Sequence, residues 1–150
     1  MSTTRKNSLA GMSIINLLKI DFFSTFTDEQ KAALSSKKIF YALKDGDYLL
    51  HKDDNEKSFY VLMQGEIEAI DDDGNILNTQ QSGSVIGEIS FLCNSPRTCN
   101  VVAVGNIFVM KIDDEIMDNL DDSLKIAIKD KLIQVLVDRV TDNDQTKVQT

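Results

Sequence analysis

The sequence is poor in the residues on which many catalytic and metal sites depend. Its 150 residues include one histidine, one proline, two cysteines and no tryptophan. A metal site built from clustered histidines, or a Ser–His–Asp or Cys–His nucleophile, would have to use His51. Cys93 and Cys99 are too few for a disulfide framework, so we interpret them as reduced thiols. We therefore expect no catalytic residue and no metal ligand, which indicates a protein that is not an enzyme.

Positive charge is also scarce. Lysine and arginine number 16 against 24 acidic residues, which gives a formal net charge of −8. An acidic chain of this kind is a poor match for nucleic acid or for an anionic membrane surface. No apolar run approaches the length of a membrane span, and the apolar segment after Arg5 and Lys6 is interrupted by Asn16 and Lys19. We expect a cytoplasmic protein with no nucleic-acid partner and no membrane insertion.

The hydrophobic pattern divides the chain into a domain and two polar ends. Residues 1–12 are small and polar and predict a flexible tail, residues 13–140 form one domain, and residues 141–150 form a polar C-terminal tail. An apolar stripe at helical spacing runs from Ile14 to Phe23. Thr27 and Gln30 have the spacing of a capping box, which predicts a helix ending near Leu34.

From Lys38 onward the pattern changes to that of strands. Short β-branched and aromatic segments alternate with Gly, Asp and Asn turn signals. We predict strands over 39–43, 48–51, 59–63, 66–71, 76–79, 101–104 and 108–112, with bends at 64–65 and 105–106. Many short strands separated by regular turns favour a mainly β fold, a jelly-roll β-sandwich or barrel with flanking helices.

Two helices are predicted at the C-terminal end. A short helix covers 113–120, and Asp121 or Asp122 caps a longer one over 123–140. The longer helix carries one apolar stripe that can dock on the domain and a second beside it. The second stripe predicts either a homodimer through this helix or deeper burial within the same domain. The first stripe is Leu124, Ile128, Leu132 and Val135, and the second is Ile126, Ile133, Val137 and Val140.

The most informative stretch, which we name the cassette, is residues 83–101. Gly87 is followed by Glu88 and a short apolar run that can survive only as one packed helical turn. The free N–H groups at the start of such a turn attract an anion, and Arg97 brings a fork that fits two phosphate oxygens. Glu88 can accept a hydrogen bond from a hydroxyl. This combination of an anion site and a hydroxyl acceptor suits a ribose phosphate.

The cassette resembles the phosphate-binding cassette of cyclic nucleotide-binding domains. The matching residues are Gly87, Glu88, Ile89, Arg97 and Thr98, with the usual gap between the acid and the arginine. The cassette departs from the family pattern at Ile86, where an aromatic residue is common, and at Cys99, where alanine is common. The resemblance extends from about residue 15 to about residue 140.

The resemblance implies a sensor that binds cAMP, or alternatively cGMP, needs no further cofactor and signals through its C-terminal helix. Binding would draw that helix over the base, with Leu132 or Val135 as base contacts, and act on an attached domain or a partner protein. Thr98 permits cGMP without requiring it. The alternative is an interaction or dimerisation module with the same fold that has lost its ligand. The implied ligand-binding residues are Gly87, Glu88, Ile89, Ser90, Arg97, Thr98 and Cys99.

Overall fold

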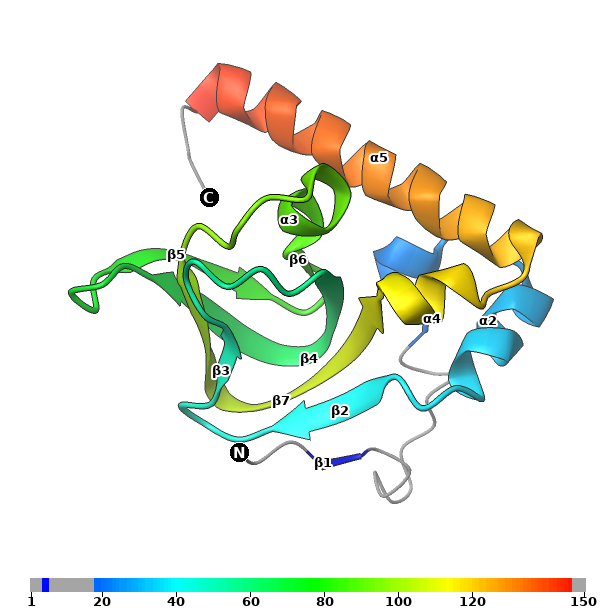
Figure 1. Ribbon diagram of the computed structural model, residues 1–150, viewed down its shortest axis with the longest axis horizontal. Helices are drawn as coiled ribbons and strands as arrows, with labels where there is room; N and C mark the ends of the chain where they lie inside the picture. Colours follow the sequence, from blue (N-terminus) through cyan, green and yellow to red (C-terminus); the bar gives the residue numbers. More distant parts are fainter. Residues whose placement is uncertain (1–3, 6–17, 147–150) are drawn as a thin grey trace.

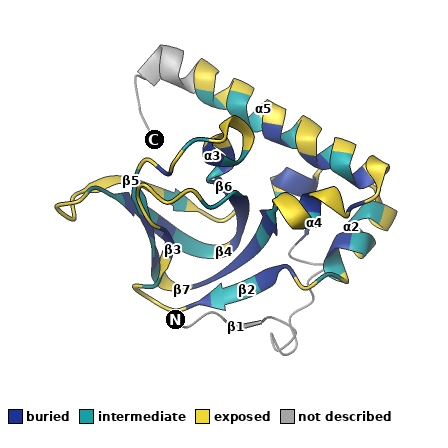
Figure 2. Cartoon of the chain, in the orientation of Figure 1, coloured by how far each residue is buried: buried dark blue, intermediate teal, exposed yellow. Residues whose placement is uncertain are grey.

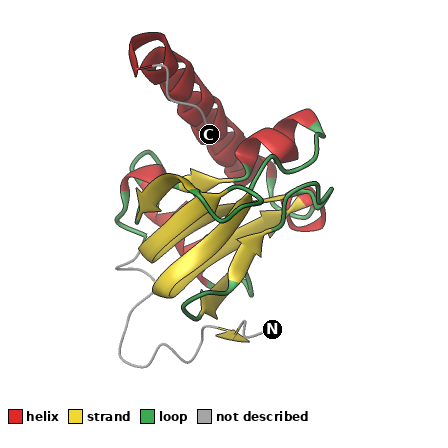
Figure 3. Cartoon of the chain, turned by 90° about the vertical axis from the view of Figure 1, so that its left-hand side faces the viewer, coloured by secondary structure: helices red, strands yellow, loops and turns green. Residues whose placement is uncertain are grey.

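The computed structural model describes residues 4–5 and 18–146, and it shows a β body with helices gathered along one side (Figure 1). The described strands form one antiparallel sheet whose main path is β1-β2-β7-β4-β5, with β3 paired to β7 and β6 to β4. Seen from the side, the strands lie next to one another in one body, with the long C-terminal helix above them and shorter helices at the sides (Figure 3). The prediction of a mainly β fold with flanking helices is confirmed. The strands are β1 Thr4–Arg5, β2 Phe40–Leu43, β3 Tyr48–Leu50, β4 Ser58–Ile70, β5 Ile76–Gln81, β6 Val85–Ile86 and β7 Asn100–Asp113.

Two long strands replace four of the predicted short ones. β4 runs through the expected bend at 64–65, and β7 runs through the one at 105–106. The β4–β7 register shifts on both sides of Gln64, so the extra residues form irregularities within a continuous ladder. Gly65 makes this possible because its φ is +104° and a Cβ there would lie 2.8 Å from Cγ2 of Ile107. The prediction that the strands end at these glycines was wrong, because a glycine can also bend the backbone within a continuous strand.

The predicted capping box at the start of α2 (Asp28–Ser35) is confirmed. The Thr27 N–H donates to Oε1 of Gln30 at 2.9 Å, and the Gln30 N–H donates to the Thr27 hydroxyl at 3.0 Å. Gln30 also donates to the Ser123 hydroxyl at 2.7 Å, which ties α2 to the C-terminal helix. Ahead of it, η2 (Asp21–Phe23) is a single 3-10 turn. Most of the predicted tail over 1–12, and the start of the apolar stripe at 14–17, lie outside the described residues.

The C-terminal helices are α4 (Asp114–Asp118) and α5 (Asp122–Thr146). Asp121 is the residue that caps α5, because its Oδ1 accepts from the Leu124 N–H at 2.8 Å. The first predicted stripe is buried: Leu124, Ile128 and Leu132 are at most 1% exposed. The second is open to solvent, so the alternative of deeper burial is wrong (Figure 2). Its exposed fractions are 60% for Ile126, 56% for Ile133, 51% for Val137 and 61% for Val140.

The interior consists of two apolar clusters. One joins the helices to the sheet and is rich in aromatic rings, with Phe22, Phe23 and Phe59 almost fully buried. The other fills the β body and includes Leu50 and Ile86. The cassette contributes to both clusters, because Val85 belongs to the first and Ile86 to the second.

Candidate functional site

Gly87 sets the geometry of the cassette. It follows β6 and has a left-handed conformation, with φ +82° and ψ +12°, immediately before α3 (Glu88–Cys93). A Cβ at this position would lie 2.6 Å from Nη1 of Arg97. The other end of α3 is also left-handed, at Asn94, which turns the chain back toward Arg97. Local backbone conformations thus bring the acid and the arginine of the cassette together.

Arg97 is buried although it carries a fixed charge. The residue as a whole is only 3% exposed. Nη1 donates to the Gly87 carbonyl at 2.8 Å, and Nη2 donates to the carbonyl of Ser58 at 2.7 Å and to its hydroxyl at 3.1 Å. Among the described residues, the carboxylate of Glu56 comes within ion-pair distance, with Oε1 4.0 Å from Nη2. The hydrogen bonds of the guanidinium therefore go to neutral oxygens, and Glu56 is a longer-range ion-pair partner.

The third nitrogen of the guanidinium, Nε, is buried and has no hydrogen-bond partner among the described residues. Burial lowers the pKa of the guanidinium, and Tyr60 and Glu56 act in the opposite direction. A buried donor without a partner is costly, and an anion arriving beside it removes that cost. This arrangement favours an anionic ligand at Arg97.

The main chain of Arg97 is also clamped. Its N–H donates to the Asp54 carbonyl at 2.9 Å, and its carbonyl accepts from the Asp53 N–H at 2.8 Å. Asp53 has a φ of +69°. The loop between β3 and β4 thus holds Arg97 through two backbone hydrogen bonds, a contact between segments distant in sequence.

Glu88 is the most deeply buried acid of the described residues, at 1% exposed. Its Oε2 lies 2.8 Å from Nε of Arg139, which reaches over from α5. Burial raises the pKa of the Glu88 carboxyl above its usual value, while Arg139 and Arg97 act to lower the pKa. Arg139 also donates to the Val85 carbonyl at 2.9 Å. One carboxylate oxygen is therefore engaged by the helix, at the edge of the same cavity that Arg97 borders.

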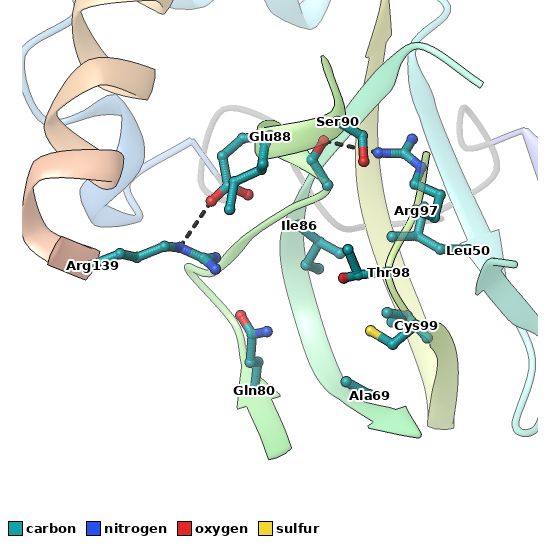
Figure 4. Close-up of a pocket in the computed structure, with 13 residues that line it drawn as sticks. Leu50, Ala69, Gln80, Ile86, Glu88, Ser90, Arg97, Thr98, Cys99 and Arg139 are labelled. Carbon is teal, nitrogen blue, oxygen red and sulfur yellow. Dashed lines mark hydrogen bonds and ion pairs between the residues drawn. The ribbon is translucent and has the colours of Figure 1, made fainter. Parts of the chain in front are cut away.

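These groups surround one pocket, which encloses about 580 Å³ when the open space at its mouth is included (Figure 4). Its polar end is formed by the cassette, and its other walls are apolar except at Gln80 and Arg139. The structure brings all seven predicted ligand-binding residues to this pocket: Gly87, Glu88, Ile89, Ser90, Arg97, Thr98 and Cys99. The apolar walls come from Leu50, Ala69, Ile86 and Val101. A charged end beside an apolar slot suits a ligand with an anionic group and a flat, poorly solvated part.

Sequence reasoning missed two polar residues of the pocket, Gln80 of β5 and Arg139 of α5. Arg139 had a signal in the sequence, because it continues the buried stripe of α5 four residues beyond Val135. An arginine in line with a buried apolar stripe lies on the helix face that docks on the domain, so its side chain is expected to contact the domain. Gln80 had no comparable signal, because its position depends on the pairing of β5 with β4.

The suggested base contacts from α5 do not fit the structure. Leu132 is fully buried in the core, and Val135 packs against the same core. The helical face that bears these residues is used to dock α5 on the domain. The contact of α5 with the pocket is made one turn further along, by Arg139.

Other classes of site find no support in the described part of the chain. Its acidic, cysteine and histidine side chains form no group of three or more that could hold a metal ion. None of its helices combines the length and the apolar composition that crossing a bilayer requires.

Comparison with known proteins gives a match to one family model. The model describes a cyclic nucleotide-binding domain and matches residues 41–123. This range contains the β3–β4 loop, the whole cassette and α4, but it stops near the start of α5.

Individual relatives share between about a fifth and a third of their aligned residues with this chain. The human cyclic nucleotide-gated channel beta-3 is 32% identical over 143 residues, which cover 86% of this chain and 17% of the channel. A crystal structure of a cyclic nucleotide-binding domain from Methylobacillus flagellatus has a TM-score of 0.73 at 24% identity, covering 92% of this chain and 82% of that one. The regulatory domain of Toxoplasma gondii PKA, solved with cAMP, has a TM-score of 0.61 at 19% identity, covering 80% of this chain and 48% of that one. The chain spans 12–17% of the length of three nucleotide-gated channels that it matches.

Proposed function

Because this chain belongs to the cyclic nucleotide-binding domain family, we propose that it is a regulatory module that binds cAMP or cGMP and catalyses no reaction itself. The observation that carries the proposal is the pair formed by Arg97 and Glu88 at one end of the pocket. The buried guanidinium of Arg97 has an unused Nε, and the buried carboxylate of Glu88 lines the same pocket. A ribose with a cyclic phosphate carries an anion and a hydroxyl only a few ångströms apart. The guanidinium can bind the anion, and the carboxylate can accept the hydrogen bond of the hydroxyl.

Each residue of the cassette has a role in this proposal. Arg97 binds the cyclic phosphate through a charge-assisted hydrogen bond, and the backbone N–H groups of Ile89 and Ser90 bind the same phosphate. Glu88 accepts a hydrogen bond from the ribose 2′-hydroxyl. Gly87 allows the sugar phosphate to approach the backbone closely. The purine lies against the apolar walls, where Cys99 supplies a small, half-buried side chain.

We favour cAMP over cGMP as the ligand. The neighbour from Toxoplasma gondii was solved with cAMP, whereas the human channel relative is named only for cyclic nucleotides. Thr98 is exposed at the edge of the pocket, where its hydroxyl can reach the phosphate or the 2-amino group of guanine. The second contact would permit cGMP as well.

The output of the module is α5, which borders the pocket through Arg139 and exposes an apolar stripe on its other side. We propose that ligand binding changes the position of this helix and thereby acts on an attached domain, a partner or a second copy of the chain. The free energy by which the ligand shifts the equilibrium between the two helix positions cannot exceed the difference between its binding free energies for them. A cytoplasmic location is part of the proposal, supported by the free thiols of Cys93 and Cys99.

A second candidate is an interaction or dimerisation module that does not depend on a ligand. It is favoured by the exposed stripe on α5 and by the two Arg97 nitrogens that already bind protein carbonyls. The unused Nε of Arg97 favours the sensor instead, because a pocket without a ligand has no need of a buried, unpaired donor.

Isothermal titration calorimetry with cAMP and cGMP distinguishes the two candidates. Arg97→Ala is expected to weaken nucleotide binding by roughly tenfold to a hundredfold or more, the loss of a charge-assisted hydrogen bond worth about 1.5–3 kcal/mol. Lys129→Ala, which removes an exposed cation of α5 outside the pocket, is the matched control and should bind like the wild type. Absence of binding to both nucleotides at millimolar concentration, or unchanged binding by Arg97→Ala, would exclude the sensor.

A further inference from the structure

Glu56 is shared unequally between two cations. Its Oε2 accepts a hydrogen bond from Nζ of Lys111 at 2.7 Å, whereas its Oε1 lies 4.0 Å from Nη2 of Arg97. The first distance is that of a direct, charge-assisted hydrogen bond, and the second is at the outer limit of an ion pair. The carboxylate therefore binds Lys111 more closely, although it lies in the β3–β4 loop that holds the main chain of Arg97.

Lys111 is anchored beside Glu56 by its place in the sheet. It lies opposite Tyr60 in the β4–β7 ladder, and its Nζ is 5.7 Å from the centroid of the Tyr60 ring. Burial acts to lower the pKa of the Lys111 ammonium, but Glu56 and Tyr60 together raise this pKa above its usual value. Lys111 therefore stays charged. It lines a different pocket from the one that Arg97 lines, so it does not touch a ligand of the cassette.

The acids around Arg97 influence how strongly it attracts an anion. Burial lowers the pKa of its guanidinium, while Glu56, Asp54 and Glu88 act in the opposite direction, so each acid offsets part of the positive charge. Among the described residues, only the carboxylate of Glu56 comes within ion-pair distance of the guanidinium. A negative charge at this position opposes an incoming phosphate, because the two repel each other. Lys111 neutralises this carboxylate.

We propose that Lys111 is a positioning residue for the phosphate site: by holding the carboxylate of Glu56, it keeps that negative charge from offsetting Arg97 and strengthens the binding of an anion that it does not touch. The inference rests on the proposed function, because the anion is the cyclic phosphate. Without Lys111, the ion-pair partner that remains for Glu56 among the described residues is Arg97. That pair has no net charge to offer a phosphate.

The test is calorimetry of the full chain with cAMP and cGMP on the wild type, Lys111→Met, Glu56→Gln and the double variant. Methionine keeps an unbranched side chain but removes the charge. Lys111→Met should weaken binding about threefold to tenfold, the effect of one unit charge near a partly buried site. Glu56→Gln should tighten binding by about threefold, because it removes the opposing charge. The double variant should return to within about twofold of the wild type.

Two further variants control for the loss of a lysine as such. Lys111→Arg keeps the charge and should bind like the wild type. Lys44→Met removes an exposed lysine of the β2–β3 turn that lines neither pocket, and it should also bind like the wild type. If Lys111 served only to hold the sheet together, the double variant would bind at least as weakly as Lys111→Met, and this result would overturn the proposal.

The opposite sign expected for Glu56→Gln keeps the test decisive even if Lys111→Met does not fold. Weaker nucleotide binding by Glu56→Gln would show that this carboxylate assists Arg97 and would contradict the role of Lys111.

The outcomes also separate this inference from the proposed function. If the wild type binds neither cAMP nor cGMP, the sensor and the role of Lys111 fail together. If the wild type binds a nucleotide and Lys111→Met binds it equally well, the sensor stands and the role of Lys111 alone is wrong.

Discussion

The guanidinium of Arg97 lies so close to Gly87 that there is no room for a side chain at position 87. Nη1 of Arg97 donates to the Gly87 carbonyl at 2.8 Å, and a Cβ on Gly87 would lie 2.6 Å from the same nitrogen. The guanidinium therefore rests directly on the glycine backbone. This contact fixes the direction in which the remaining Nε of Arg97 points.

Gly87→Ala is expected to impair ligand binding more than folding. The methyl group forces the guanidinium to move, and a φ of +82° strains any residue with a Cβ by about 1–2 kcal/mol. Nucleotide affinity should fall at least tenfold in calorimetry. Gly83→Ala is the matched control, because Gly83 has a φ of +99° with no atom within 4 Å of the added Cβ. It should lose similar stability in denaturant unfolding but keep its affinity; equal affinity losses in both variants would contradict the role of the contact with Arg97.

Glu88 should make the domain less stable as the pH rises. Burial raises the pKa of its carboxyl in the folded state, so the folded chain holds this proton more tightly than the unfolded chain does. The stabilisation is present below the unfolded pKa and is lost as the pH rises through the folded pKa. Glu88→Gln should therefore raise the free energy of unfolding at pH 7 relative to the wild type, with a smaller difference at pH 4. Urea unfolding at both values measures this; a variant that is less stable at pH 7 would mean that the ion pair with Arg139 outweighs burial.

The two stripes of α5 should differ in their contribution to stability. Ile128→Ala opens a cavity in the core and is expected to cost about 2–5 kcal/mol. Ile126→Ala, two residues earlier on the exposed stripe, should change the free energy of unfolding by no more than about 0.5 kcal/mol in the monomer. Thermal unfolding at low protein concentration compares the two directly. Similar losses for both would mean that Ile126 is buried in solution.

The exposed stripe also carries the prediction of a homodimer. Ile126, Ile133 and Val140 recur at intervals of seven along α5, a spacing that aligns apolar residues along a helix pair. If a second copy covers the stripe, sedimentation velocity should show a concentration-dependent dimer. Ile133→Asp should abolish this dimer, whereas Asp138→Lys, at an exposed position of α5 away from the stripe, should preserve it. A wild-type chain that stays monomeric at high concentration would contradict the homodimer, and the stripe would then have to bind a different partner.

Thr98→Ala separates the two nucleotides. Loss of a hydrogen bond to the guanine 2-amino group should weaken cGMP binding by about fivefold to tenfold, because a neutral hydrogen bond contributes about 1 kcal/mol. The affinity for cAMP should change less. Calorimetry with both nucleotides gives the ratio, and Thr98→Ser, which retains the hydroxyl, is the control. Equal losses for both nucleotides would place the hydroxyl on the phosphate instead.

The amino-acid sequence by itself determined the features that depend on neighbours in the chain. The capping box at Thr27 needs only three residues of spacing, and the seven cassette residues reach one pocket because a short turn between Gly87 and Arg97 leaves the chain few other paths. The two apolar stripes of α5 followed from the helical period, whereas the exposure of the second stripe was decided by the tertiary structure. Each of the features that the sequence determined rests on local geometry, which is encoded within a few residues.

Only the tertiary structure decided what lies opposite the cassette. The 4.0 Å approach of Glu56 to Arg97, the Ser58 oxygens on the same guanidinium and Arg139 on Glu88 come from segments distant in sequence. It also made β4 and β7 continuous where glycines had predicted breaks, because the ladder between them absorbs the irregularities. Such contacts depend on strand register and on how a helix docks, and these are settled by the packing of the whole domain.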